Sequence, residues 1–263
     1  MLVEERRHRV LEIVKGRGFV ALTDLKSAVQ ASDSTLRRDL DYWDERGVLK
    51  RTHGGAMFTG ELLVMPALED RAGSATAEKE QIAQAAVARI RDGDAILLDG
   101  GTTTLEVAKL LVGRSLQIVT NSLPIANLFG SRREVDLVLL GGYVYPKTGV
   151  MLGPLTIRMM EDVHVHQAIL SVGGITAKGL FNSNLLLVET ERRMMRCADE
   201  VVVVADHTKI GRQALAFLCE LAAIDTLIVD ATSSPEQHRI IEDGGARLIV
   251  AGERRTAPEE FRS

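Results

Sequence analysis

Two groups of polar side chains in this 263-residue chain have types and spacings that suit ligand binding. The first lies on a predicted helix that Ser32 would cap. Apolar residues recur along one side of it at three- and four-residue steps: Leu36, Leu40 and Trp43. The other side carries Ser34, Thr35, Arg37 and Arg38. Hydroxyls and guanidiniums near the N-terminal end of a short helix can read bases in the DNA major groove, although an ordinary solvated amphipathic helix also fits this stretch alone.

The neighbouring sequence favours DNA binding. Helices are predicted over residues 3–15 and 23–30, with a short strand at 19–21. Residues 48–51 read as a strand and residues 52–56 as a glycine turn, which completes the order of a winged helix-turn-helix module. Four basic residues are then expected near DNA phosphates: Arg46, Lys50, Arg51 and His53. The alternative for Arg37 and Arg38 is surface ion pairing with Asp41 and Asp44.

The second group follows a predicted strand at residues 95–98. It consists of Asp99, Gly100, Gly101, Thr102, Thr103 and Thr104. Glycines let a backbone approach an anion closely, and the threonines and the start of the next helix supply donors, so phosphate is the natural ligand. The chain lacks the Gly-Lys-Ser/Thr of a nucleoside triphosphate loop here, and the dinucleotide-binding spacing is also absent. A tight strand-to-helix turn without a ligand is the alternative.

The remaining pattern predicts an open, mostly parallel α/β sheet. Aliphatic runs typical of strands buried on both faces lie at 95–98, 116–119, 135–140, 168–172, 201–205, 226–229 and 247–250. Helices are expected over 78–91, 103–111, 124–128, 154–162, 188–198 and 235–243. The last of these helices has Pro235 just inside its start, and Ser233 and Glu236 have capping-box spacing.

Ligands of such sheets bind beyond the carboxyl ends of the strands. Polar and glycine residues at the other predicted strand ends and loops therefore join the second group: Asn121, Gly142, Gly173, Asn182 and Lys209. Asp99, Asn121 and Asn182 could orient sugar hydroxyls. The threonines and Lys209 could hold a phosphate.

Both groups resemble the signatures of one family, the DeoR-type bacterial transcriptional regulators. Two runs resemble the family's N-terminal signature: Ser-Asp-Ser-Thr-Leu-Arg-Arg-Asp-Leu from Ser32, and Gly-Val-Leu-Lys-Arg-Thr-His-Gly-Gly-Ala from Gly47. This chain has Ala31 where valine is usual and Leu36 where isoleucine is usual. The family's C-terminal domain resembles the runs Asp-Gly-Gly-Thr-Thr-Thr from Asp99, Thr-Asn-Ser from Thr120, Gly-Leu-Phe-Asn-Ser-Asn from Gly179, Val-Glu-Thr-Glu-Arg from Val188 and Ala-Asp-His-Thr-Lys-Ile-Gly-Arg from Ala205.

In that family the C-terminal domain resembles ribose-5-phosphate isomerase and senses phosphorylated sugars or related metabolites. The resemblance implies that residues 101–104 hold the phosphate and that Lys209 aligns with the lysine of the site. It also implies that Asp99 and Asn121 read the sugar.

Length and charge indicate the organisation of the whole chain. We predict a winged helix-turn-helix domain over residues 1–57, a linker over 58–77, an effector-sensing α/β domain over 78–252 and a tail over 253–263. The net charge is −4, with +2 in residues 1–60 and −6 in the remainder, so the basic contribution to DNA binding is local and modest. We therefore expect a homodimer or homotetramer whose DNA binding weakens steeply with salt.

The remaining expectations concern the surroundings of the chain. Cys197 and Cys219 suit unreactive thiols in a reducing cytoplasm, and no run is long and apolar enough to cross a membrane. No cofactor or metal is expected, because His164 and His166 lack a cysteine or acidic partner at ligand spacing.

Two functions from different classes fit these observations. The favoured one is a non-enzymatic repressor of a carbohydrate operon, released from its double-stranded DNA operator by a phosphorylated sugar. The alternative is a sugar-phosphate isomerase-like enzyme with a nucleic-acid-binding arm, in which Asp99 and Lys209 would supply acid–base chemistry. Five further residues have structural interpretations. Glu189 and Glu191 fit helix-start charges or, equally, ligand contacts; Asp206 fits a turn cap; and Met194 and Met195 fit core positions.

Overall fold

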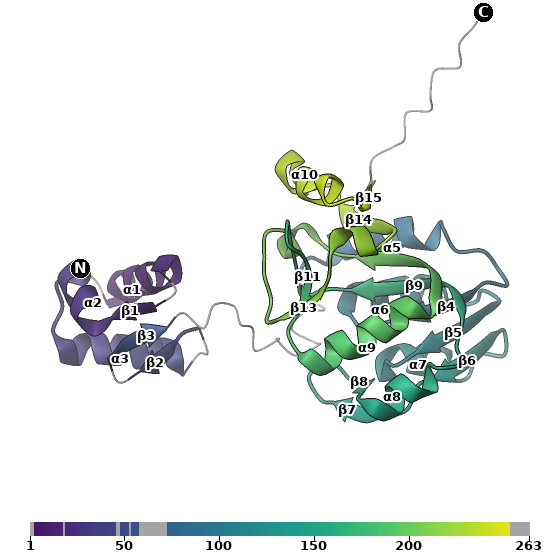
Figure 1. Ribbon diagram of the computed structural model, residues 1–263, viewed down its shortest axis with the longest axis horizontal. Coiled ribbons are helices and arrows are strands. Elements are labelled where there is room, and N and C mark those ends of the chain that lie inside the picture. The colour runs from purple at the N-terminus through teal and green to yellow at the C-terminus, as the bar shows by residue number, and fades with distance from the viewer. Residues whose placement is uncertain (1–2, 18, 46–47, 53, 58–72, 253–263) are drawn as a thin grey trace, which may run out of the picture. The chain divides into compact units, whose positions relative to one another are not determined.

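The computed structural model describes residues 3–17, 19–45, 48–52, 54–57 and 73–252. The chain divides into two compact units, residues 1–64 and 65–263 (Figure 1). Several predictions fall outside the described residues: the linker up to residue 72, the tail over 253–263, and the DNA contacts Arg46 and His53.

The first unit is a winged helix-turn-helix. Its elements are α1 (Val3–Arg17), β1 (Phe19–Ala21), α2 (Leu22–Val29), α3 (Asp33–Asp44), β2 (Lys50–Thr52) and β3 (Gly55–Met57). The three strands form an antiparallel sheet in the order β1-β3-β2 within the described residues. One apolar cluster holds the helices together, with Val10, Val14, Leu25 and Leu36 almost fully buried. The helices and wing expected from the sequence are therefore present.

The second unit is built on a parallel sheet. In the described part of the chain this sheet has seven strands in the order β15-β14-β12-β9-β4-β5-β6, and every adjacent pair is parallel. The strands are β4 (Ala95–Leu98), β5 (Leu116–Thr120), β6 (Val135–Leu139), β9 (Val165–Ser171), β12 (Ala198–Val204), β14 (Thr226–Asp230) and β15 (Arg247–Ala251). Each matches one predicted aliphatic run, which confirms the predicted α/β class.

Helices cover both faces of this sheet (Figure 1). One face packs against α5 (Thr76–Val87), α6 (Thr102–Leu110) and α7 (Leu123–Phe129). The other packs against α8 (Pro154–Met159), α9 (Leu185–Arg196) and α10 (Pro235–Asp243). Two separate apolar clusters result, and the strands contribute alternate side chains to each.

A smaller antiparallel sheet and a hairpin were not predicted. The sheet pairs β10 (Gly174–Thr176), β11 (Gly179–Asn182) and β13 (Ala216–Cys219), and the hairpin joins β7 (Tyr143–Tyr145) to β8 (Val150–Leu152). These strands have three or four residues each, too short for a periodic signal. Two short 3₁₀ turns also occur, η1 (His207–Lys209) and η2 (Leu221–Ala223).

The capping pair of α10 and the start of α9 differ from the prediction. The capping box of α10 joins Ser234 to Gln237 and not Ser233 to Glu236, because Ser233 Oγ donates to the carbonyl of Asp230 at 2.6 Å. The helix α9 begins at Leu185, not at residue 188, because Asn184 caps it by accepting from the N–H of Leu186 at 2.7 Å.

The membrane and cysteine expectations concern the same described residues. None of the helices described there is both long and apolar enough to span a bilayer. Cys197 and Cys219 are free thiols, and burial raises the pKa of both, that of Cys219 to about 11. Met194 is fully buried in the core and Met195 packs against it, as expected.

Candidate functional site

The recognition helix α3 presents its predicted DNA-reading face to solvent. Ser34, Arg37 and Arg38 are exposed, whereas Leu36 and Leu40 on the opposite side are buried. Ser32 caps the helix by accepting from the N–H of Thr35 at 3.3 Å. The hydroxyls of Ser34 and Thr35 lie 3.1 and 2.9 Å from Ser32 Oγ. The helix start is therefore ordered by its own hydroxyls while both guanidiniums stay exposed.

A buried carboxylate that the sequence reasoning missed fastens α3 to α1. Asp39 is 1% exposed and accepts hydrogen bonds from Arg6 Nε at 2.6 Å and Arg7 Nε at 3.2 Å. The Arg7 guanidinium also lies 3.9 Å from the centre of the Tyr42 ring. Trp43 Nε1 donates to the Arg7 carbonyl at 2.9 Å. These contacts fix the helix that carries Arg37 and Arg38.

Arg51, one of the predicted phosphate contacts on the wing, forms contacts with α3. The Arg51 guanidinium pairs with Asp41 at 2.5 Å, and the N–H of Arg51 donates to Asp44 at 3.0 Å. Asp41 thus pairs with Arg51. The sequence had also allowed Asp41 to form an ion pair with Arg37 or Arg38. Lys50 lies on β2, in register with Met57 of β3.

In the second unit, Asp99 joins the ends of two neighbouring strands. It follows β4 and is 4% exposed. Its Oδ2 accepts from the N–H of Ser171 at 3.3 Å and from Ser171 Oγ at 3.1 Å, at the end of β9. The carboxylate is therefore held at the carboxyl edge of the sheet.

The predicted phosphate turn also packs closely. A Cβ on Gly100 would lie 1.9 Å from Val150 Cγ1, and one on Gly101 would lie 1.9 Å from Ser171 Oγ. The N–H of Gly101 donates to Thr104 Oγ1 at 2.7 Å, and that hydroxyl donates to the Gly101 carbonyl at 2.9 Å. Thr102 and Thr103, in the first turn of α6, are 8% and 5% exposed. Both glycines are thus required by packing alone, as the strand-to-helix turn interpretation allowed.

Asn121 lies at the end of β5, next to the β7–β8 hairpin. Its Nδ2 donates to the Met151 carbonyl at 3.0 Å. Its Oδ1 is buried and has no hydrogen-bond partner among the described residues. One side of the amide is therefore anchored and the other retains an acceptor.

Asn182 and Glu191 form the innermost polar contact of this edge. Asn182 Nδ2 donates to Glu191 Oε1 at 2.5 Å, and Asn182 Oδ1 accepts from the N–H of Ser183 at 2.8 Å. A Cβ on Gly173 would lie 3.2 Å from Asn182 Oδ1. Burial, with a smaller contribution from the charge of Asp99, raises the pKa of Glu191 well above its usual value. Glu191 is 1% exposed and lies in the middle of α9, whereas Glu189 is exposed; both follow the first turn, so the helix-start interpretation is wrong.

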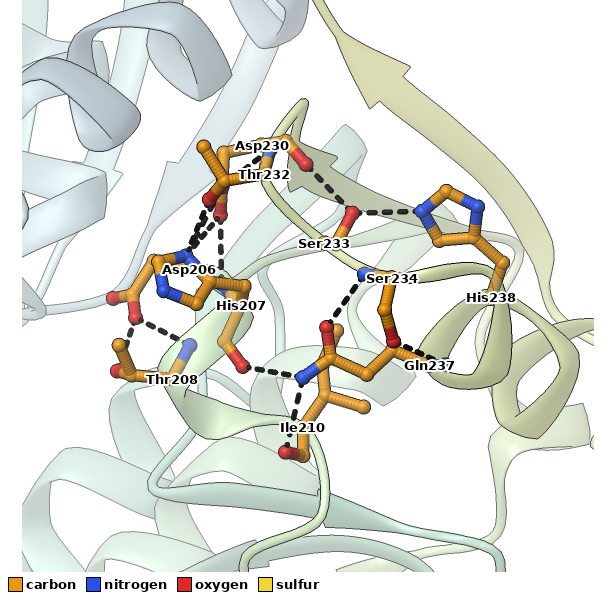
Figure 2. Close-up of polar contacts among 10 residues, drawn as sticks. All are labelled: Asp206, His207, Thr208, Ile210, Asp230, Thr232, Ser233, Ser234, Gln237 and His238. Carbon is orange, nitrogen blue, oxygen red and sulfur yellow. Dashed lines mark hydrogen bonds and ion pairs between the residues drawn. The ribbon is translucent and has the colours of Figure 1, made fainter.

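Lys209 belongs to the turn η1, which a second polar network holds in place. Figure 2 shows Asp206, His207 and Asp230 at the centre of this network. Asp206 caps the turn by accepting from the N–H of Thr208 at 3.1 Å, which agrees with the turn-cap role expected from the sequence. The N–H of His207 donates to Asp230 Oδ2 at 2.6 Å, and Gln237 Nε2 donates to the His207 carbonyl at 3.0 Å. Within the described residues, no carboxylate lies within ion-pairing distance of the half-exposed Lys209 ammonium.

The predicted effector residues therefore do not all lie together. Contacts among neighbouring strand ends bring together Asp99, Gly100, Gly101, Thr104, Gly173 and Asn182, with Glu191 and Ser171 added. Gly142 instead faces α8, where a Cβ would lie 2.1 Å from Thr156 Oγ1. Lys209 follows β12, two strands from β4.

Asp39 and Glu191 carry a sequence signal that was overlooked. Asp39 falls three residues after Leu36 and four before Trp43, and Glu191 falls three residues after Val188 and three before Met194. An acidic residue on the apolar stripe of a helix is a buried carboxylate that needs partners. By contrast, the His207–Asp230 contact joins the turn η1 to the end of β14 and has no local pattern.

Comparison with known proteins agrees with this architecture. The DeoR-like helix-turn-helix domain model matches residues 6–61, and the DeoR C terminal sensor domain model matches residues 74–231. The Glycerol-3-phosphate regulon repressor of Escherichia coli (strain K12) is 30% identical over 246 residues, covering 93% of this chain and 97% of that protein. The putative aga operon transcriptional repressor of Escherichia coli O157:H7 is 29% identical over 253 residues, covering 95% and 94%.

Two further comparisons cover a relative and a solved structure. The uncharacterized HTH-type transcriptional regulator YulB of Bacillus subtilis (strain 168) is 30% identical over 251 residues, covering 95% of this chain and 97% of that protein. The ribose 5-phosphate isomerase A structure from Methanocaldococcus jannaschii is 19% identical with a TM-score of 0.38, covering 52% of this chain and 55% of that one. Because both domain models match in order and the relatives align over nearly their whole length, the chain belongs to the DeoR family of DNA-binding transcriptional regulators.

Proposed function

We propose that this regulator represses a carbohydrate operon and leaves its operator when a phosphorylated sugar binds at the carboxyl edge of the parallel sheet. The observation that carries the proposal is the pairing, in one chain, of a DNA-binding unit with a sensor unit whose anion-suited turn and buried hydroxyl-binding groups share one edge. The similarity to a glycerol-3-phosphate regulon repressor and to a putative aga operon repressor supports this class of effector.

The phosphate would bind at the start of α6. The first turn of a helix carries backbone N–H groups without partners inside the helix and a partial positive charge. Residues 101–104 supply that turn, and Lys209 is a candidate for a second positive contact from η1. Asp99, Asn121 and Asn182 would bind the sugar hydroxyls.

The DNA contacts would come from α3 and the wing of each protomer in a homodimer or homotetramer. Two recognition helices would then enter successive major-groove faces about 34 Å apart. Arg37 and Arg38 would read bases, while Lys50 and Arg51 would contact phosphates. The sugar phosphate can release DNA only if it binds the operator-free arrangement of the protein more tightly than the operator-bound one. A coupling free energy of about 1–3 kcal/mol between effector and operator binding is ordinary.

Two alanine variants test the two halves of the proposal in one assay, operator binding by fluorescence anisotropy with and without a phosphorylated sugar. Arg37→Ala should lose specific operator binding, whereas the control Arg132→Ala, an exposed arginine of the second unit, should keep it. Lys209→Ala should bind the operator normally and lose the sugar-phosphate response, whereas Lys178→Ala, also exposed, should respond like the wild type. A full response in Lys209→Ala would remove that residue from the site, and unchanged operator affinity in Arg37→Ala would remove it from the interface.

An isomerase activity is the second candidate, because two carboxyls, Asp99 and Glu191, lie at this edge, and burial together with the charge of Asp99 raises the pKa of Glu191 well above its usual value. Incubating the purified chain with ribose 5-phosphate decides it. We expect no ribulose 5-phosphate, and turnover abolished by Asp99→Asn would favour the enzyme.

A further inference from the structure

Glu191 is a buried acid that the proposed functions of the neighbouring residues do not explain. It lies in the middle of α9, among apolar neighbours that include Leu187, Val188 and Met194, and is 1% exposed. A carboxylate this deep normally pairs with a cation or accepts several hydrogen bonds. Within the described residues, Glu191 forms no ion pair and accepts one hydrogen bond, from Asn182.

The surroundings of Glu191 favour its neutral form. Removal from water disfavours the ionised carboxyl, and the nearby Asp99 carboxylate adds like-charge repulsion. Asp99 differs from Glu191 in its contacts, because its Oδ2 accepts two hydrogen bonds from Ser171.

A neutral carboxyl differs from a carboxylate by being a hydrogen-bond donor. Glu191 Oε1 already accepts from Asn182, so the proton belongs on Oε2. That oxygen is buried and has no partner among the described residues. A buried donor without a partner is costly and rare in native structures, so a polar group with this geometry points to a ligand.

A second unpaired atom lies at the same edge of the sheet. Asn121 Oδ1, at the end of β5, is also buried without a partner in the described part of the chain. It can only accept, whereas Glu191 Oε2–H can donate. Since a hydroxyl both donates and accepts, the hydroxyls of a polyhydroxylated ligand have the chemistry to pair with either atom.

We propose that Glu191 is a neutral carboxylic acid whose Oε2 hydroxyl donates a hydrogen bond to a hydroxyl or carbonyl oxygen of the effector. This inference rests on the proposed function, because it assigns a specificity-determining residue to the same sugar-phosphate site. Asn182 is the positioning residue, since its amide fixes which carboxyl oxygen carries the proton.

Three variants of the full chain test the proposal by thermal unfolding and calorimetry. The probes are glycerol 3-phosphate, ribose 5-phosphate, fructose 1-phosphate and glucose 6-phosphate. Glu191→Gln keeps an acceptor for Asn182 and a donor in place of Oε2–H, so it should bind within about threefold of the wild type. Glu191→Leu has no donor and should bind about tenfold more weakly. The control Glu189→Gln, at the exposed neighbouring acid of the same helix, should match the wild type.

Infrared spectroscopy measures the protonation directly and does not depend on how the variants bind. At pH 7 the wild type should show the carbonyl band of a protonated carboxylic acid, and Glu191→Gln should lack it. A wild-type spectrum without that band, or equal affinity in Glu191→Leu and the wild type, would overturn the assignment of Glu191 alone. Failure of every probe to bind the wild type would instead overturn the proposed function together with the effector contact.

Discussion

At the scale of single residues, Asp39 and Glu191 are two buried acidic residues whose carboxyl groups have different partners. Asp39 pairs with two arginines of α1, Arg6 and Arg7. Glu191 has one amide partner, and burial favours its neutral form. The first carboxyl positions a helix, and the second leaves a donor for a ligand.

Asp39→Asn should loosen the recognition helix. The substitution leaves Arg6 and Arg7 without their charged partner and should lower the opening free energy of α1 and α3 amides by about 2 kcal/mol. Hydrogen exchange of these amides in the full chain measures this change.

The matched control is Asp41→Asn on the same helix. Asp41 is 46% exposed and pairs with a partly exposed Arg51, so its loss should cost less than about 0.5 kcal/mol. Equal exchange rates in the two variants would contradict the role of Asp39 in fastening α3 to α1.

The roles of residues could be predicted from the sequence where those residues stand close together in a short motif. Ser32, Arg37 and the Asp99–Thr104 turn stand in short motifs, so their elements could be assigned without a structure. The partners of Glu191 and Asp230 could not be assigned in this way. Asn182 meets Glu191 through the turn between β11 and α9, and His207 meets Asp230 because β12 pairs with β14.

At the scale of elements, the start of α6 depends on the absence of a side chain at Gly101. A Cβ there would lie 1.9 Å from Ser171 Oγ and 2.6 Å from Ser171 Cβ. Gly101→Ala should therefore destabilise the second unit by about 1–3 kcal/mol, and Ser171→Gly in the same chain should recover part of the loss. Chemical unfolding measures both.

Gly141→Ala is the control for this prediction. The nearest atom to a Cβ there is Met159 Sδ at 3.5 Å, an ordinary contact, so stability should change by less than about 0.5 kcal/mol. A similar loss in both alanine variants would show that packing against Ser171 is not the reason for the glycine.

The turn η1 depends on the buried carboxylate of Asp230 (Figure 2). Burial acts to raise its pKa, but hydrogen bonds from Thr232 and His207 and the charge of His207 outweigh this and lower the pKa below its usual value. A carboxylate with a lowered folded-state pKa contributes stability above its unfolded pKa, about 3.9, and loses that contribution as the pH falls through the folded pKa.

Asp230→Asn should therefore lower stability at pH 7 by about 1–2 kcal/mol, because the amide cannot accept from every donor. The difference from the wild type should shrink below about pH 4. Unfolding between pH 3 and 7 measures this, with the exposed Asp243→Asn as the control. A difference that grows on acidification would contradict the assignment.

Elements were predictable to the extent that they were long and apolar. The seven parallel strands were found because burial on both faces leaves uninterrupted aliphatic runs. The β10–β11–β13 sheet and the β7–β8 hairpin are held by pairing partners that only the folded chain supplies.

At the scale of the whole molecule, release of the operator by a sugar phosphate requires energetic coupling between the two units. Linkage is reciprocal, so a sugar phosphate that weakens operator binding must itself bind the operator complex more weakly by the same factor. Because the first sixty residues carry a charge of only +2, we expect specific contacts and the proposed oligomerisation to supply much of the affinity.

The most direct test of this coupling is the dissociation constant for the operator, measured with the sugar phosphate that raises the melting temperature and with its unphosphorylated parent. A ligand that binds the native state raises that temperature, so thermal unfolding selects the sugar. The phosphorylated sugar should raise the dissociation constant about tenfold or more, and the parent should leave it unchanged. An operator affinity that the bound sugar phosphate does not alter would contradict release of the operator by the effector.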